Sequence, residues 1–232
     1  MAIRLLVGLG NPGKEYERTR HNAGSWLVER FATANAVTLR KDPKFKALVG
    51  RMGGDAGAGG GAWLLLPQTF MNLSGQPVHM LAGFFRIKPD EILVAHDELD
   101  FPPGVAKLKQ GGGIAGHNGL RDISQRLATH DYWRLRLGIG RPPAGTQGDY
   151  VLQKPMAEDR AAIDAAIDKA LSILPLCFAG DLPGAMHKLH TEEKPPARKE
   201  PPKEAPEPEK KDPPAEAPEK KGLLSGILGR RK

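Results

Sequence analysis

The sequence has only one cysteine, few aromatic residues and no apolar run long enough to cross a membrane. A single cysteine excludes a disulfide within the chain, and the apolar residues 174–178 around it predict that Cys177 is a buried thiol. The amino terminus also lacks the pattern of a signal peptide. We therefore expect a cytoplasmic protein with no stable membrane insertion.

The histidines and carboxylates lack the spacings that are typical of metal sites. Residues 96–100 include one histidine and three carboxylates, but there is no helical His-x-x-x-His pair and no second cysteine. Alternate residues of a strand point to opposite faces, so the side chains of this cluster would diverge. We predict that the protein binds no metal ion.

Charge is distributed unevenly along the 232 residues, whose formal net charge is +7. Residues 1–190 hold 23 Lys and Arg against 18 Asp and Glu, residues 191–221 hold 8 against 9, and residues 222–232 hold 3 against none. The first segment is moderately basic. This balance suits a polyanionic partner such as RNA, although many proteins with a similar balance bind none.

Apolar runs of strand length alternate with stretches of helical periodicity. The expected strands are residues 3–9, 45–52, 62–67, 91–95, 105–109 and 133–140, and the expected helices are residues 22–36, 76–85, 118–127 and 158–178. This alternation predicts a single α/β domain at residues 1–190. Its twisted, mostly parallel mixed central sheet is flanked by helices.

Three segments depart from that pattern. Residues 53–61 are almost all Gly and Ala, and we predict a long hairpin tip there. Residues 191–221 are rich in Lys, Glu and Pro without apolar periodicity, which predicts a disordered linker. Residues 222–232 combine four apolar residues on one helical side with three cations, and we expect this segment to contact an anionic surface or another protein. A frayed tail without function is the alternative.

Polar side chains follow three of the expected strands at the point where each strand ends. Asn11 and His21 follow the first strand, Asn72 follows the run at residues 62–67, and Asp97 follows the run at residues 91–95. The carboxyl ends of parallel strands share one edge of a sheet, and ligands bind in the crevice there. These four residues are therefore candidates for one pocket.

Gly8, Gly10 and Gly13 follow a strand with the spacing of a dinucleotide-binding loop. That motif needs its last glycine within a helix and an acidic residue about 20 positions further on, at the end of the next strand. Residues 14–20 carry no apolar stripe, and the acidic residue nearest that position lies in a helical pattern. We therefore favour a sharp turn that exposes Asn11, and we expect no cofactor.

An imidazole paired with a carboxylate activates water near neutral pH, because the ordinary pKa of histidine is about 6.5. His21 and Asp97 form one such candidate pair, in which the carboxylate would fix the tautomer and stabilise the imidazolium. His96 would point to the opposite face of its strand from Asp97 and is interpreted as structural, whereas His117 fits either role. Residue types alone leave the identity of the base open.

Asparagines and basic residues complete the set of candidates. Asn11, Asn72 and Asn118 lie in turn sequences, where asparagine is common, but an amide also suits binding of a peptide backbone or an oxyanion. Basic residues occupy alternate positions of residues 107–109 and 134–136, so each pair shares one face. That face is either solvated or bound to phosphates.

Four separated blocks resemble the bacterial peptidyl-tRNA hydrolase family in order and spacing. They lie at residues 8–22, 69–75, 96–100 and 116–120, and they contain the motifs GLGNPG and TRHN, TFMNLSG, HDELD and GHNGL. The resemblance extends from about residue 3 to about residue 189. Chance rarely produces four such blocks in the right order, so the family assignment rests on their combination.

The resemblance implies a monomeric enzyme that hydrolyses the ester between a nascent peptide and tRNA, releasing free peptide and reusable tRNA. It implies that His21 activates water and that Asp97 orients His21. It further implies a substrate-binding set and a tRNA phosphate clamp. In the substrate-binding set, Asn11 and Asn72 hold the peptide, Tyr16 and Met71 line the pocket and Asn118 positions the water or the oxyanion, while Lys109 and Arg136 match the clamp. Residues 111–116 would form a mobile gate.

Two other functions compete with this interpretation. A non-catalytic RNA-binding protein on the same scaffold is the first, because relatives recruited to intron splicing can keep the active-site residues. Turnover of peptidyl-tRNA by the purified protein discriminates the two. A nucleotide-dependent enzyme built on the glycine loop is the second, and it would bind NAD or a similar dinucleotide tightly.

Overall fold

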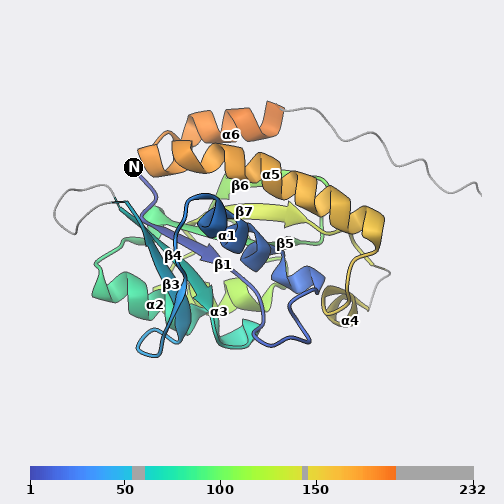
Figure 1. Ribbon diagram of the computed structural model, residues 1–232, viewed down its shortest axis with the longest axis horizontal. Helices are drawn as coiled ribbons and strands as arrows, with labels where there is room; N and C mark the ends of the chain where they lie inside the picture. The colour runs from blue at the N-terminus through green and yellow to red at the C-terminus, as the bar shows by residue number, and fades with distance from the viewer. Residues whose placement is uncertain (54–60, 143–145, 192–232) are drawn as a thin grey trace, which may run out of the picture. The chain divides into compact units, whose positions relative to one another are not determined.

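The centre of the computed structural model, which describes residues 1–53, 61–142 and 146–191, is a seven-stranded mixed sheet (Figure 1). The strands lie in the order β2-β3-β4-β1-β5-β7-β6. Their bounds are β1 Leu5–Gly8, β2 Arg40–Asp42, β3 Ala47–Met52, β4 Ala62–Pro67, β5 Ile92–Glu98, β6 Ala106–Gln110 and β7 Trp133–Gly138. Most of the predicted hairpin tip, and the predicted linker and terminal segment after residue 191, lie outside the described residues.

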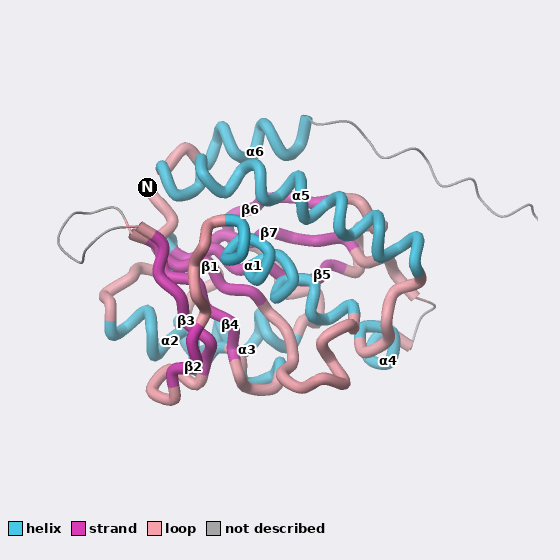
Figure 2. Tube along the Cα trace, in the orientation of Figure 1, coloured by secondary structure: helices cyan, strands magenta, loops and turns pink. Residues whose placement is uncertain are grey.

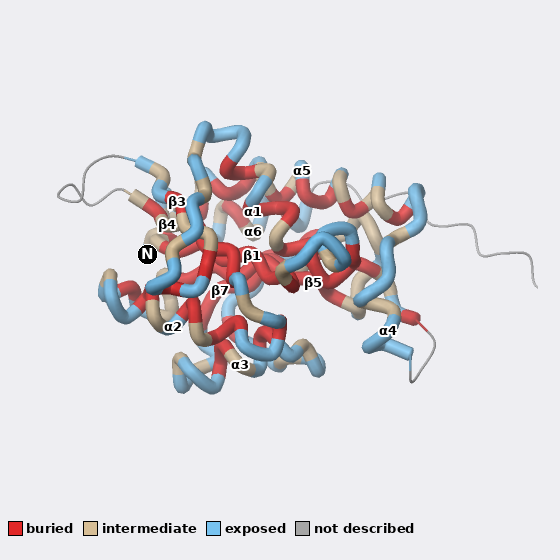
Figure 3. The backbone as a smooth tube through the Cα atoms, turned by 60° about the horizontal axis from the view of Figure 1, so that its bottom comes forward, coloured by how far each residue is buried: buried red, intermediate tan, exposed pale blue. Residues whose placement is uncertain are grey.

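Parallel pairing occurs among the four central strands, β4, β1, β5 and β7. Strands β2, β3 and β6 pair antiparallel at the two edges of the sheet. Every residue of β1 and of β5 is buried, as expected for strands covered on both faces (Figure 3). The predicted mixed sheet is confirmed, and its parallel part brings the carboxyl ends of β1, β4 and β5 to one edge.

Helices cover both faces of the sheet (Figure 2). Their bounds are α1 Ala23–Ala34, α2 Gly75–Phe84, α3 Asn118–Leu127, α4 Gln147–Val151, α5 Ala157–Ala179 and α6 Leu182–Thr191. Short 3-10 helices lie at η1 Arg20–Asn22, η2 Met71–Leu73 and η3 Pro89–Glu91. One apolar core joins α1, α5 and α6 to the sheet, and a second joins α2 and α3 to the opposite face. The predicted α/β class is confirmed.

The predicted elements are present with small differences at their ends, and three further elements are β2, α4 and α6. Strand β2 is short, polar and partly exposed, so it carries no apolar signal. Cys177 on α5 is buried, as predicted, and burial raises the pKa of its thiol to about 12. In the part of the chain that the structure describes, no helix has both the length and the hydropathy needed to cross a bilayer.

Candidate active site

The polar residues predicted to follow three strands lie together at one edge of the sheet. Strand β1 leads into the loop that carries Asn11, β4 leads towards η2, which begins at Met71, and Asp97 lies near the end of β5. The side-chain Oδ1 of Asn11 accepts a hydrogen bond of 2.7 Å from the backbone N–H of Met71. This bond ties the β1 and β4 loops to each other beside β5.

Close packing between helix α1 and the sheet brings His21 to this edge. A Cβ atom at Gly8 would lie 2.6 Å from the carbonyl oxygen of Gly24, and a Cβ atom at Gly24 would overlap the carbonyl oxygen of Ala95 on β5. Only glycine permits this approach at both positions. Because η1 directly precedes α1, the packing places His21 against β5.

The glycine loop does not have the geometry of a dinucleotide-binding loop. Gly13 adopts a φ of +110° in a turn, and the first regular element after it is η1. The motif requires its last glycine within the helix that follows the strand. The glycines instead form a turn at the end of β1, as favoured from the sequence. The expectation that this turn exposes Asn11 is wrong, because Asn11 is buried.

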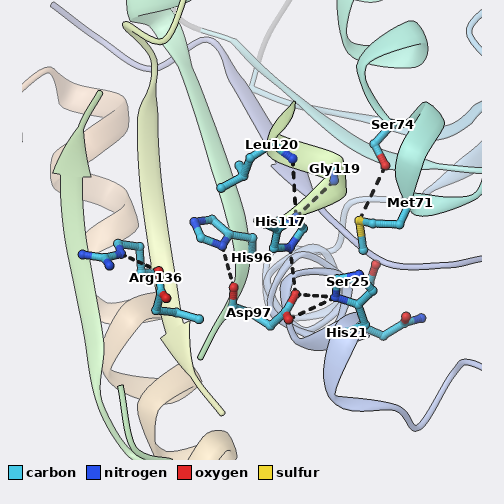
Figure 4. Close-up of polar contacts among 12 residues, drawn as sticks. His21, Ser25, Met71, Ser74, His96, Asp97, His117, Gly119, Leu120 and Arg136 are labelled. Carbon is cyan, nitrogen blue, oxygen red and sulfur yellow. Dashed lines mark hydrogen bonds and ion pairs between the residues drawn. The ribbon is translucent and has the colours of Figure 1, made fainter. Parts of the chain in front are cut away.

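His21, Asp97 and His117 form a chain of hydrogen bonds in which His21 and Asp97 are buried and His117 is partly buried (Figure 4). The Nδ1 atom of His21 lies 2.9 and 3.0 Å from the two carboxylate oxygens of Asp97. The Nε2 atom of His117 lies 3.0 Å from Oδ1 of the same carboxylate. The side chain of Asp97 is only 2% exposed, so both imidazoles meet a carboxylate that water barely reaches.

The hydrogen-bond network assigns a tautomer to each of these imidazoles. Nδ1 of His117 accepts the backbone N–H groups of Gly119 and Leu120, at 3.1 and 3.4 Å, so its proton is on Nε2 and points to Asp97. Nδ1 of His21 donates to Asp97, which leaves the lone pair of His21 on Nε2. That Nε2 atom has no hydrogen-bond partner among the described residues. His21 is therefore the ring in position to accept a proton.

The shifted pKa values agree with this assignment. Burial opposes protonation of His21, but the charge of Asp97 and the hydrogen bond to it outweigh burial and raise the pKa of His21 above 6.5. Burial alone would raise the pKa of Asp97, but His21 and His117 hold it well below its ordinary value of 3.8. The carboxylate is therefore ionised at neutral pH and stabilises a proton on His21.

His96 is buried and does not act on the same face. Its Nδ1 donates to the backbone carbonyl of Asp97 at 2.6 Å, while its Nε2 is buried without a partner among the described residues. Burial, together with the neighbouring His117, lowers the pKa of His96 to about 3. A histidine that stays neutral across the physiological range fits the structural role predicted for it.

Asn11 is held by a residue that sequence reasoning did not select. The side chain of Asn22 accepts the backbone N–H of Asn11 at 2.9 Å and donates to its carbonyl at 3.0 Å. Since Met71 occupies Oδ1 of Asn11, only its Nδ2 remains to donate to a ligand. Asn22 ends the TRHN motif directly after His21, and its place in that motif was the signal that could have identified it.

The remaining predicted pocket residues lie on three different elements. Asn72 is exposed on η2, and Asn118 is exposed at the start of α3, where its Oδ1 accepts a hydrogen bond from Arg121 at 2.9 Å. Met71 is buried. Tyr16 is half-buried, with its ring edge-on to Phe70 at 6.3 Å between centroids.

Ligand atoms of His21, Asp97 and His117 lie within 4.8 Å of one another, which is close enough to hold a metal ion. The same atoms are joined by hydrogen bonds of 2.9–3.0 Å. Zinc at about 2.0–2.1 Å from an imidazole nitrogen would replace these protons. The backbone donors on His117 fix its proton on the nitrogen that faces Asp97, so the residues are arranged as a hydrogen-bonded chain.

The predicted basic face is formed by β6 and β7, whose register places Lys107 opposite Arg136 and Lys109 opposite Arg134. The two lysines are exposed, but the arginines are partly engaged within the protein. Nε of Arg136 is 2.9 Å from a carboxylate oxygen of Glu98. Arg134 is buried and donates to the carbonyls of Gly112 and Gly113, so it anchors the loop predicted to be a gate.

A cavity of about 420 Å³ lies between Asp97 and the basic strand β7. Asp97, His117 and Asn118 line one part of it, and Arg136 lines another, whereas His21 and Lys109 are not among its lining residues. Gln147 and Val151 on α4 also line it, and no sequence pattern indicated them. Asp97, His117 and Arg136 therefore face a common space.

An imidazole–carboxylate pair beside a cavity, at the carboxyl edge of an α/β sheet, is the arrangement of an enzyme that activates water. A sequence profile described as peptidyl-tRNA hydrolase matches residues 5–197 of the chain. This chain belongs to the peptidyl-tRNA hydrolase family.

The matches to individual relatives extend over nearly the whole length of each relative. The chain is 52% identical over 200 residues to a peptidyl-tRNA hydrolase of Thiobacillus denitrificans, covering 86% of this chain and 96% of the relative. It is 54% identical over 194 residues to that of Pseudomonas fluorescens, covering 83% and 98%. The crystal structure of peptidyl-tRNA hydrolase from Acinetobacter baumannii has 47% identity and a TM-score of 0.78, and covers 82% of this chain and 95% of that one.

Proposed function

We propose that this chain hydrolyses the ester bond between a nascent peptide and the terminal ribose of tRNA, with His21 as the general base. The observation that supports the proposal is the chain of hydrogen bonds in which Asp97 accepts Nδ1–H of His21, while Nε2 of His21 has no partner in the part of the chain that the structure describes. Family membership supports the substrate, and the related enzymes named above carry the same activity in their names.

In the proposed mechanism, Nε2 of His21 takes a proton from water while the water oxygen attacks the ester carbonyl carbon. The carbonyl π electrons move to oxygen and form a tetrahedral intermediate. When this intermediate collapses, the bond to the ribose oxygen breaks, and His21 returns its proton to that oxygen. Asp97 stays ionised throughout and stabilises the imidazolium form of His21. Peptide carboxylate and tRNA are the products.

Three asparagines supply the polar contacts in this proposal. Asn11 offers only its Nδ2 donor, which suits a carbonyl oxygen of the peptide. Asn72 is exposed and offers both a donor and an acceptor to the peptide backbone. Asn118 lines the cavity beside Asp97, where its amide would position water or donate to the developing oxyanion. Tyr16 and Met71 would line the peptide side of the pocket.

Lys109 and Arg136 would hold a phosphate of the tRNA. Phosphate contacts carry no information about base sequence. They therefore suit an enzyme that accepts many tRNAs. Glu98 occupies Nε of Arg136 and leaves its two terminal nitrogens for a phosphate. The arginine is therefore oriented before the substrate arrives.

The alternative of a non-catalytic RNA-binding protein is not favoured, since the matched relatives are hydrolases. A decisive assay compares N-acetylated aminoacyl-tRNA with the free-amine form. We expect release of the blocked amino acid and sparing of the unblocked ester. Tight RNA binding without turnover would contradict the proposal and support the alternative.

We further propose that the protein works as a cytoplasmic monomer without metal or cofactor. Activity that survives dialysis against EDTA, and a monomer mass in sedimentation equilibrium, would support these points. The proposed contact of residues 222–232 with an anionic surface or a partner protein rests on sequence alone, because those residues lie outside the described ones. Truncation after His190 should leave activity on isolated peptidyl-tRNA intact. Loss of co-sedimentation with ribosomes or vesicles would support the contact.

A further inference from the structure

An exposed aromatic ring with a lysine over its face lies on α2, towards the opposite edge of the sheet from the proposed phosphate clamp. Phe84, the last residue of α2, is 57% exposed. Nζ of Lys44, in the turn between β2 and β3, lies 3.3 Å from the centre of its ring. Figure 2 shows this turn beside α2, and Nζ of Lys46 in the same turn is 3.3 Å from Oε1 of Gln76. We call Lys44, Lys46, Phe84 and Arg86 the Phe84 surface.

The aromatic ring is held in place by other aromatic side chains. Phe84 meets Phe45 and Phe85 edge-on, with centroids 5.7 and 4.9 Å apart. Phe85 in turn stacks on Trp63 at 4.1 Å. An apolar ring that packs by its edges while more than half of it stays exposed is fixed in orientation before any ligand binds. This rigidity lowers the entropy lost when a ligand stacks on it.

The cations of the Phe84 surface have no carboxylate partner. Among the described residues, none of Lys44, Lys46 and Arg86 is within 4.0 Å of an acidic oxygen, whereas Arg30, Arg126 and Arg136 all form ion pairs. Unpaired positive charge around an exposed ring is complementary to a nucleic acid strand, with phosphates for the cations and a base for the ring.

Two cations of the Phe84 surface occupy strained backbone positions. Lys46 and Arg86 both have a φ of +52°, in the left-handed region that glycine occupies without strain. Arg86 follows the end of α2, where glycine is the usual residue. Long cationic side chains therefore occupy two positions of this surface at which glycine would fold more easily. Ala36 and Ala128 have a similar φ, so the strain serves to design variants and does not itself indicate binding.

We propose that the Phe84 surface binds a single-stranded segment of RNA, in which one base displaces Nζ of Lys44 from the ring of Phe84 and Lys44, Lys46 and Arg86 bind the adjoining phosphates. A base is free to stack on a side chain only where it is unpaired, so the strand must be single. Five strand spacings of about 4.8 Å separate β3 from β6, which puts this contact roughly 24 Å from Lys109. The surface is therefore a second RNA contact, beyond the proposed hydrolytic site.

Fluorescence anisotropy with the full chain and a labelled oligouridylate of about eight nucleotides tests the proposal. Phe84→Ala and Phe84→Leu should each raise the Kd by about fivefold or more, because base stacking on an aromatic ring contributes at least that much. Phe84→Leu keeps an apolar side chain against Phe45, so a loss of affinity in that variant reports stacking rather than packing. A duplex of the same length should bind more weakly and respond to neither variant.

The strained positions allow a double glycine variant with a matched control. Lys46→Gly with Arg86→Gly should flatten the slope of log K against log salt by about 0.7 for each lost phosphate contact. Thermal stability should not fall, because glycine relieves the strained backbone. Ala128→Gly is the control, since Ala128 has a φ of +54° and carries no charge. That control should leave RNA affinity and salt slope unchanged.

Further measurements separate this proposal from its rivals and from the hydrolytic function. His21→Ala should keep full affinity for the oligouridylate. Failure of the RNA-binding proposal can therefore be distinguished from failure of the hydrolytic proposal. Wild-type affinity in the Phe84 and glycine variants would overturn the RNA surface. Displacement of the oligouridylate by polyglutamate at equal charge concentration, with no effect of Phe84→Leu, would assign the surface to an acidic polypeptide and overturn it as well.

Discussion

The His21–Asp97–His117 chain and the basic residues of β6 and β7 are neighbours in space, yet they are built in opposite ways. These three residues are joined by hydrogen bonds of 2.9–3.0 Å, and His21 and Asp97 among them are buried and have shifted pKa values. Lys107 and Lys109 are exposed on an edge strand and form no ion pair with a described residue.

Proton transfer and phosphate binding have different physical requirements, and this difference explains the contrast. Proton transfer needs one tautomer at one position, which burial and directional hydrogen bonds supply. Phosphate binding needs positive charge that adapts to a flexible polyanion, which exposed lysines supply. Arg136 is intermediate, because Glu98 fixes one of its nitrogens and leaves the others free. Substitutions in the two regions should therefore change different kinetic parameters.

Replacement of His21 should give the largest effect. We expect His21→Ala to lower kcat by about 10²-fold to 10⁴-fold, the usual contribution of a general base, with little change in tRNA affinity. Single-turnover hydrolysis of N-acetylated aminoacyl-tRNA measures the chemical step. His130→Ala is the control, since His130 is exposed in a turn. Retention of most activity by His21→Ala would place the base elsewhere.

Asp97→Asn should come next, with a loss of at least about tenfold in kcat. The charge of Asp97 raises the pKa of His21, so the wild-type activity should fall as pH drops below that raised pKa and protonates the base. An amide cannot stabilise the imidazolium, so Asp97→Asn should move this acid limb to lower pH. A pH–rate profile of both proteins measures the shift. An acid limb in the same place would remove Asp97 from the control of His21.

Changes in the basic strands should act on binding instead. Lys109→Ala should raise KM for peptidyl-tRNA and flatten its salt dependence by roughly 0.7 to 0.9 in log–log slope, because one phosphate contact is lost. The value of kcat should stay close to that of the wild type. Lys188→Ala, on α6, is the charge-matched control. An unchanged salt slope would mean that Lys109 lies on a solvated surface and does not contact a phosphate.

The smallest effect at neutral pH should come from His96, whose consequences appear only in acid. Its pKa is about 3 in the fold, whereas the ordinary pKa of histidine is about 6.5, so the unfolded state binds one more proton between these values. The free energy of unfolding should therefore fall as pH drops below about 6.5, by up to about 1.4 kcal/mol per pH unit. His96→Asn keeps a donor for the Asp97 carbonyl and should reduce this slope in urea titrations. An equal slope in both proteins would contradict the assignment.

The sequence by itself determined the α/β class, the strands that end in polar residues, and the membership of Asn11, His21, Asn72 and Asp97 in one edge. These features follow from local apolar periodicity and from the rule that parallel strands share a carboxyl edge. Strand β2 and helix α4 escaped that reasoning because short, polar segments carry little periodic signal. Helix α6 does carry Leu182, Ala185 and Leu189 at helical spacing, so its signal was present in the sequence and was missed.

Only the tertiary structure decided which histidine holds the free lone pair. His21 and Asp97 are 76 residues apart, and Asp97 and His117 are 20 apart, so no local pattern relates their atoms. The tautomer of His117 depends on two backbone N–H groups at the start of α3, which exist as donors only once that helix has formed. Hydrogen-bond direction is a property of folded atoms in space, whereas apolar periodicity is already present in the unfolded chain.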